Sequence, residues 1–172
     1  MNWKLAHNIG QINHSNYNTR EQILACNDPI GFDGIYRNVY ENKDALEGKT
    51  GILFVMGDYV GKDNSFDLQN VPQLEKYCTW DEIIEIVSDY KFMVGWHTWS
   101  HPDLTTLSDE EIRKEITPPF PMETFAYPYG RYNDRVIQLV KEAGYKYAFS
   151  VTQGSSNPSD PDYNYKIYRS YI

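Results

Sequence analysis

Cysteine, basic side chains and long apolar runs are all scarce in this chain of 172 residues. Cys26 and Cys78 are its only cysteines and form no CxxC pair, so one disulfide is possible and two buried free thiols are expected. With 16 Lys and Arg against 24 Asp and Glu, the net charge of −8 argues against a nucleic-acid partner. No apolar run approaches the length of a membrane span or of a signal-peptide core. We therefore expect no membrane span and a cytoplasmic location unless a signal lies outside this sequence; the oligomeric state stays open.

Apolar runs typical of strands alternate with helical patterns along most of the chain. The runs predict strands at residues 22–26, 51–56, 92–96, 124–127 and 147–151, with 165–171 as a further candidate. Repeated strand–helix units predict a parallel sheet with helices outside, in a single domain over residues 21–172. Residues 1–20 are rich in Asn and lack periodicity, so we interpret them as an N-terminal arm.

Capping residues mark three of the expected helix starts. Thr79 with Glu82, and Ser108 with Glu111, match the Thr/Ser-x-x-Glu capping box, and Asn133 is a suitable N-cap for a later helix. A helix is also expected over residues 33–41, after the first predicted strand. The loops after residues 96 and 127 therefore leave the C-terminal ends of strands, where α/β barrels place their sites.

Two of the four histidines, His97 and His101, lie four residues apart directly behind the apolar run 92–96. In an extended strand they would be roughly 13 Å apart, at ~3.3 Å per residue. A single metal ion needs both imidazole nitrogens at roughly 2.0–2.1 Å, so metal binding requires the chain to curl after His97. The alternative is two unrelated histidines that cap or pack.

The wider motifs resemble those of a known family. The string His97-Thr98-Trp99-Ser100-His101-Pro102 is similar to the second motif, His-Ser/Thr-x-x-His-Pro, of the NodB-homology polysaccharide deacetylases, carbohydrate esterase family 4. Residues 125–130, Phe-Ala-Tyr-Pro-Tyr-Gly, resemble the third motif. The resemblance covers roughly residues 22–152. It implies a distorted (β/α) barrel with fewer than eight strands, and a divalent metal bound by His97 and His101.

The first motif of that family, Thr-Phe-Asp-Asp-Gly, is altered here. The simplest alignment places Asp28 on the aspartate that binds metal and Asn27 on the aspartate that acts as general base. An amide has no group that accepts a proton at neutral pH, so Asn27 would weaken catalysis. A second alignment places Asp28 on the base and leaves the metal to the two histidines, joined by Asp33. Alternatively, Asn27 and Asp28 are simply turn residues before a proline.

The third motif is altered as well. Ala126 occupies the position where the family often has an Arg that orients the base, while the backbone N–H of Tyr129 can still stabilise an oxyanion. No histidine follows His101, so the family's late general acid is missing unless the arm folds over the site with His7 or His14. Arg169 is interpreted as a surface residue. Three residues of the motif loops are expected to contact substrate: Trp99, Tyr127 and Pro128.

Together these residues predict a metal-dependent hydrolase that removes N-acetyl groups from a polysaccharide or oligosaccharide. Asp28, His97 and His101 would bind one divalent ion, with Zn²⁺ as first choice and Co²⁺ or Ni²⁺ as alternatives. The missing base and Arg leave two other hypotheses open. One is a weakened or inactive carbohydrate-binding homologue, and the other is an O-acetyl esterase.

Overall fold

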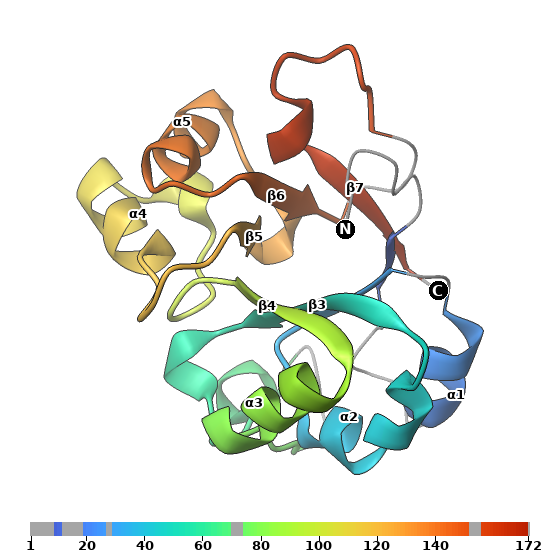
Figure 1. Ribbon diagram of the computed structural model, residues 1–172. Coiled ribbons are helices and arrows are strands. Elements are labelled where there is room, and N and C mark those ends of the chain that lie inside the picture. Colours follow the sequence, from blue (N-terminus) through green and yellow to red (C-terminus); the bar gives the residue numbers. More distant parts are fainter. Residues whose placement is uncertain (1–8, 12–18, 27–28, 70–73, 152–155, 172) are drawn as a thin grey trace.

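The computed structural model describes residues 9–11, 19–26, 29–69, 74–151 and 156–171, and Figure 1 shows how its elements are arranged. The longer helices are α1 (Thr19–Ala25), α2 (Arg37–Glu41), α3 (Trp80–Asp89), α4 (Asp109–Ile116) and α5 (Asp134–Glu142). The strands are β1 (Ile9–Gln11), β2 (Ile30–Asp33), β3 (Thr50–Val55), β4 (Lys91–Trp96), β5 (Thr124–Ala126), β6 (Tyr147–Ser150) and β7 (Ile167–Tyr171). Within this described part, no helix is long and apolar enough to cross a membrane.

The seven strands seen in the described residues form a closed barrel in chain order, and every neighbouring pair is parallel. β1 closes the barrel because it pairs with β2 on one side and with β7 on the other. The helices lie outside the strands (Figure 1). This confirms the predicted parallel barrel with fewer than eight strands, and it places the C-terminal ends of all strands on one rim.

The start of the chain differs from the expectation in two ways. The predicted strand at residues 22–26 lies mostly in α1, where Ile23 is buried and Leu24 is exposed, and Cys26 just after the helix is buried again. So short an apolar run cannot by itself distinguish a strand from one face of a helix. The strand is β2 instead, so the helix expected from residue 33 begins only at Arg37. The predicted arm also contributes to the domain, because residues 9–11 form β1.

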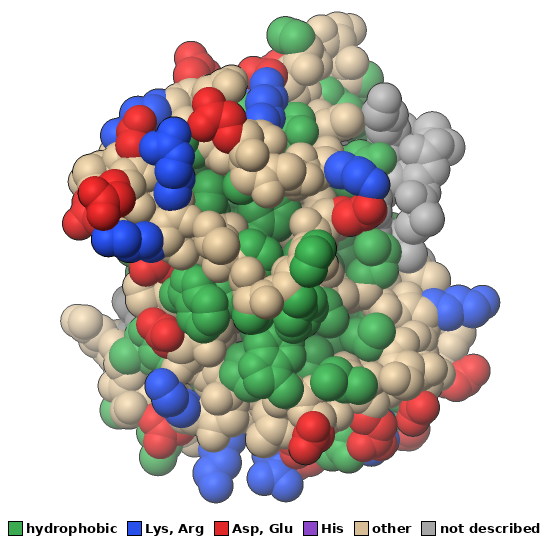
Figure 2. All heavy atoms as spheres, turned by 60° about the vertical axis from the view of Figure 1, so that its left-hand side comes forward, with side chains coloured by type: hydrophobic (Ala, Val, Ile, Leu, Met, Phe, Trp, Pro, Cys, Tyr) green, Lys and Arg blue, Asp and Glu red, His purple; other side chains and the backbone are tan. Residues whose placement is uncertain are grey.

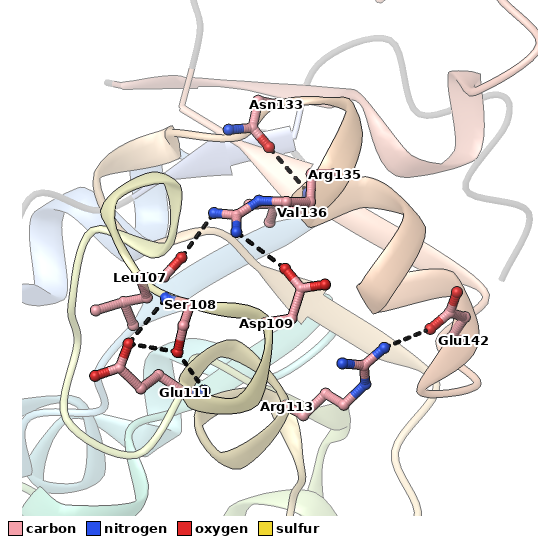
Figure 3. Close-up of polar contacts among 9 residues, drawn as sticks. All are labelled: Leu107, Ser108, Asp109, Glu111, Arg113, Asn133, Arg135, Val136 and Glu142. Atoms are coloured by element: carbon pink, nitrogen blue, oxygen red, sulfur yellow. Dashed lines mark hydrogen bonds and ion pairs between the residues drawn. The ribbon is translucent and has the colours of Figure 1, made fainter.

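The predicted capping boxes at Thr79 and Ser108 are both present, and each side chain accepts a hydrogen bond from the third helical N–H. Asn133 Oδ1 caps α5 in the same way, accepting from Val136 N at 2.9 Å. Figure 3 shows the caps at Ser108 and Asn133 together with the links between α4 and α5. Arg135 donates to the carbonyl oxygen of Leu107 at 2.7 Å and to Asp109 at 2.9 Å. The two helices that flank β5 are therefore tied together at their ends.

Strand residues contribute to two separate apolar clusters. One cluster, which includes Leu53, Val55 and Trp96, packs against the helices. The other lies inside the barrel and consists of Ile52, Phe54, Ala126, Phe149 and Ile167. Because side chains of a strand alternate between its faces, the residues next to outward-facing Phe32 and Trp96 point inward. The barrel interior is thus where polar side chains at the strand ends meet.

Both cysteines are buried and neither forms a disulfide, as predicted. Burial raises the pKa of the Cys78 thiol to about 12, and its Sγ lies 3.4 Å from the carbonyl oxygen of Tyr36. Since the thiolate is the reactive form, the native protein should not react with a disulfide reagent within minutes at pH 8. Protein unfolded in guanidinium should titrate two thiols. Rapid reaction of a thiol in the native protein would contradict this packing.

Candidate active site

His97 follows β4 and is almost completely buried. Its Nδ1 lies 2.8 Å from the carbonyl oxygen of Ala126. A carbonyl oxygen only accepts hydrogen bonds, so Nδ1 carries the proton and the lone pair of the neutral ring is on Nε2. Histidine ligands of metals are commonly held in this way, with one ring nitrogen donating to the protein and the other facing the ion.

Burial lowers the pKa of His97 from its usual value. The carboxylate of Asp33 and the hydrogen bond to the Ala126 carbonyl oppose this effect, while the charge of Arg169 adds to it. Burial is the largest of these influences, so the neutral imidazole is favoured. A neutral imidazole is the form that binds metal.

The chain curls after His97, as metal binding requires. Thr98 and His101 both adopt positive φ, at 68° and 60°, and His101 N donates to Thr98 Oγ1 at 3.0 Å. The two imidazole centroids are 4.8 Å apart. Positive φ is unusual for a β-branched residue, and such conformations persist only where surrounding contacts fix them. The prediction that the two histidines converge is therefore confirmed.

Glu115 of α4 fixes the histidine loop from one side. Its Oε2 accepts from the backbone N–H groups of Trp99 and Ser100, both at 2.9 Å, and Oε1 accepts from Ser100 Oγ at 2.7 Å. On the other side, the N–H of Gly57 donates to the Thr98 carbonyl oxygen at 3.0 Å. A Cβ at Gly57 would lie 2.3 Å from the Trp99 ring, so only glycine allows this approach. Nothing local in the sequence indicates the role of Glu115.

Asp33, the last residue of β2, is a carboxylate that lies close to His97 among the described residues. Its Oδ2 lies 3.9 Å from His97 Nε2. Both of its oxygens accept hydrogen bonds from Arg169 of β7, including one of 2.8 Å from Nη2 to Oδ2. Arg169 is fully buried, so its interpretation as a surface residue is wrong. The string Gly31-Phe32-Asp33-Gly34 resembles the family's first motif with one aspartate fewer, and this signal could have identified Asp33.

The predicted residues Asn27 and Asp28 lie outside the described residues, so their roles stay predictions. Their alignment assumed that residues 22–26 form the first strand, but most of these residues lie in the helix α1. The strand that carries a carboxylate to the rim is β2. Asp33 is therefore a second candidate for a carboxylate of the first motif, beside the predicted Asn27 and Asp28.

The loop after β5 completes the candidate site. Tyr129 has a φ of 57° and is 54% exposed, and its ring centroid lies 4.6 Å from that of His101. Ser150 Oγ donates to the carbonyl oxygen of Gly130 at 2.9 Å and so ties this loop to β6. The ring of Tyr129 thus lies beside His101, and the role of its backbone N–H in stabilising an oxyanion stays a prediction.

The three expected substrate contacts have different outcomes. Tyr127 is fully buried and its hydroxyl donates to the Tyr165 carbonyl oxygen at 3.0 Å, so its side chain is a core residue and cannot contact substrate. Pro128 is buried too, and the same correction applies. Trp99 is partly buried, packs edge-on against Trp96 and donates from Nε1 to the Thr117 carbonyl oxygen. Its contact with substrate stays a prediction.

The side chains at this rim are of the type that binds a divalent ion. In the part of the chain that is described, no three His, Cys, Asp or Glu side chains are arranged to hold a metal ion. His97 and His101 nevertheless supply two neighbouring imidazoles, with the Nδ1 of His97 already engaged by a carbonyl. Imidazole pairs near a carboxylate are typical of sites for Zn²⁺ and related ions. The donor chemistry of the site therefore fits such an ion.

A sequence profile of the polysaccharide deacetylase family matches residues 47–148. The chain therefore belongs to the polysaccharide deacetylase family. It is 26% identical over 151 residues to a poly-β-1,6-N-acetyl-D-glucosamine N-deacetylase of Staphylococcus aureus strain MSSA476, an alignment that covers 78% of this chain and 51% of the relative. The corresponding protein of strain MRSA252 is 28% identical over 147 residues, with the same coverage. The chain thus spans about half the length of these relatives.

Solved structures share the fold at low sequence identity. The Streptococcus pyogenes deacetylase PplD, in complex with acetate, aligns with a TM-score of 0.67 at 19% identity, over 83% of this chain and 63% of that one. IcaB from Ammonifex degensii aligns with a TM-score of 0.68 at 19% identity, over 83% of this chain and 66% of that one. The BpsB deacetylase domain from Bordetella bronchiseptica aligns with a TM-score of 0.69 at 14% identity, over 83% of this chain and 70% of that one.

Glu115 offers a test of how the histidine loop is held. Glu115→Ala removes three hydrogen bonds to one carboxylate and should lower the free energy of unfolding by about 2 kcal/mol. Thermal unfolding followed by circular dichroism measures the change. Glu110→Ala is the matched control, because Glu110 lies on the same helix and pairs across the surface with Lys114. Equal melting temperatures for the two variants would show that Glu115 does not support the loop.

Proposed function

We propose that this chain is a metal-assisted hydrolase that removes N-acetyl groups from a glucosamine-containing polysaccharide. The observation that carries the proposal is the meeting of Asp33, His97 and His101 at one rim of the barrel. Family membership and the names of the Staphylococcus aureus relatives support the reaction and the kind of substrate.

His97 and His101 are the proposed metal ligands, with Asp28 as a further candidate outside the described residues. When bound, a divalent ion polarises the acetamide carbonyl and lowers the pKa of water. His97 would use Nε2, because Nδ1 is committed to the Ala126 carbonyl. Zn²⁺ remains the first choice for this donor set, with Co²⁺ and Ni²⁺ as alternatives.

Asp33 is proposed to accept the proton of the attacking water. Two ligand atoms about 2.0–2.1 Å from one tetrahedral ion lie roughly 3.3 Å apart, which is shorter than the 3.9 Å between Asp33 Oδ2 and His97 Nε2. This longer separation supports Asp33 as a proton acceptor and not as a ligand of an ion shared with His97. An alignment of Phe32 with the Phe of the family's first motif, Thr-Phe-Asp-Asp-Gly, places Asp33 on its first aspartate. The resemblance gives that aspartate the role of general base.

Tyr129 and nearby aromatic residues are the proposed contacts with the sugar. The backbone N–H of Tyr129 would stabilise the oxyanion, and its exposed ring lies beside His101. Tyr59 donates from its hydroxyl to the Ser100 carbonyl oxygen at 3.3 Å and stacks on half-exposed Phe66, with ring centroids 3.8 Å apart. Figure 2 shows hydrophobic side chains near the middle of one face of the molecule, with charged side chains around them; no histidine is visible on that face. Exposed rings close to the histidine loop suit the apolar faces of a sugar.

Metal binding by the histidines is testable without any substrate. Protein purified without chelator and dialysed against Co²⁺ should hold about one equivalent, and the H97A/H101A double variant should hold none. Asp33→Asn should keep the metal, because Asp33 is proposed as the proton acceptor and not as a ligand. Elemental analysis measures the content. Loss of the ion in Asp33→Asn would reassign Asp33 as a ligand.

Acetate release tests the reaction itself. Wild-type protein loaded with Zn²⁺ or Co²⁺ should release acetate from oligomers of β-1,6-linked N-acetylglucosamine, and Asp33→Asn should lower kcat by roughly 10²–10⁴-fold. Asp44→Asn is the control, since Asp44 pairs with Arg20 on the surface. Release only from an O-acetylated xylan would make the chain an esterase. No release from either substrate would favour the carbohydrate-binding alternative.

A further inference from the structure

We propose that Arg169 is a positioning residue for Asp33, and that it supplies from the last strand the guanidinium that the family's third motif would place at residue 126. The inference rests on the proposed function, because it assigns Asp33 the role of proton acceptor. It concerns how this particular chain keeps an oriented carboxylate although Ala126 provides no Arg. Three observations support it.

The first observation is the contact itself. The two terminal nitrogens of Arg169 each donate to a different oxygen of Asp33. Such paired bonds fix the plane of a carboxylate, which a single donor cannot do. The guanidinium is held in turn, because Nε donates to the Ser150 carbonyl oxygen at 3.2 Å and the group lies 5.0 Å from the centroid of the Phe54 ring. Arg169 has no exposed surface, so water cannot replace these contacts.

The second observation is that position 126 faces the same space. Ala126 belongs to the interior cluster with Phe54, and the guanidinium of Arg169 lies over the ring of that same Phe54. Ile167, two residues before Arg169, is also in this cluster, so both side chains of β7 point into the barrel. A guanidinium carried by either β5 or β7 could therefore reach the interior beside Asp33.

The third observation is that the pair lies where orientation matters. The Asp33 oxygen that faces His97 Nε2, Oδ2, also accepts from Arg169. A carboxylate free to rotate could turn this oxygen away from the histidines or onto the metal ion. With both oxygens held, each keeps lone-pair capacity for a further donor. Arg169 thus controls the direction in which Asp33 accepts a proton.

Kinetics on β-1,6-linked N-acetylglucosamine oligomers test this role. Arg169→Lys keeps the charge but not the paired hydrogen bonds, so kcat should fall roughly 10- to 100-fold while KM changes little. Arg169→Ala should lose more activity and is prone to misfold, because it leaves a buried carboxylate without its partner. Adding Ala126→Arg to Arg169→Ala should restore folding and raise kcat at least about tenfold over the single variant. Lys114→Ala, on the surface of α4, is the control.

A second readout does not depend on activity. In protein loaded with Co²⁺, Asp33→Asn should leave the visible spectrum of wild type unchanged, because Arg169 holds Asp33 away from the ion. In the Arg169→Lys background, Asp33 is less restrained, and Asp33→Asn should then alter the spectrum. This difference between the two backgrounds is the signature of positioning.

The outcomes separate the two proposals. Arg169→Lys with wild-type kcat, or an A126R/R169A double variant that folds without regaining activity, would overturn the role of Arg169. If Asp33→Asn leaves the Co²⁺ spectrum unchanged in the Arg169→Lys background as well as in wild type, the role of Arg169 would also be overturned. A wild-type chain without acetate release would overturn the proposed function, and the Co²⁺ spectra would then decide the positioning role alone. A chain that neither releases acetate nor binds Co²⁺ would overturn both.

Discussion

The buried ion pair between Asp33 and Arg169 joins the second strand of the barrel to the last, and the arrangement of the site depends on it. Both strands pair with β1, so the two side chains meet across the place where the barrel closes. Removing one partner of a buried ion pair leaves an uncompensated charge, which costs about 3–5 kcal/mol. The same contact that stabilises the closed barrel therefore holds the carboxylate beside His97, and stability and chemistry are linked at one point.

The rest of the site follows from parallel strands and their alternating faces. His97 and Asp33 come directly after outward-facing apolar residues, so both enter the interior at the C-terminal rim. The loop from Thr98 to His101 then turns back through two residues with positive φ. Glu115 on one side and the backbone after β3 on the other compensate for this strain by satisfying the loop's polar groups. The histidines converge because hydrogen bonds from elements on both sides fix the backbone of the loop.

The structure supplies two groups that the sequence motifs, as first aligned, lack. A carboxylate stands at the end of the strand that carries the first motif, and an arginine orients it, although Ala126 supplies none. The sequence interpretation named Asp33 only as an alternative partner of the histidines, because residues 22–26 satisfy a strand pattern and a helix pattern equally well. Once that run was interpreted as the first strand, Asp33 was assigned to the following helix. A local pattern could not show that Arg169, 136 residues later, is its partner.

The sequence by itself determined the features that depend on neighbours along the chain. These include the histidine motif, the capping boxes, the alternation that makes a parallel barrel, and two buried cysteines. Only the tertiary structure decided that Asp33 reaches His97, that Arg169 is buried, that Glu115 supports the loop and that Tyr127 packs in the core. The reason is physical. Periodicity and capping are set over a few residues, whereas contacts across a closed barrel exist only after all its strands have paired.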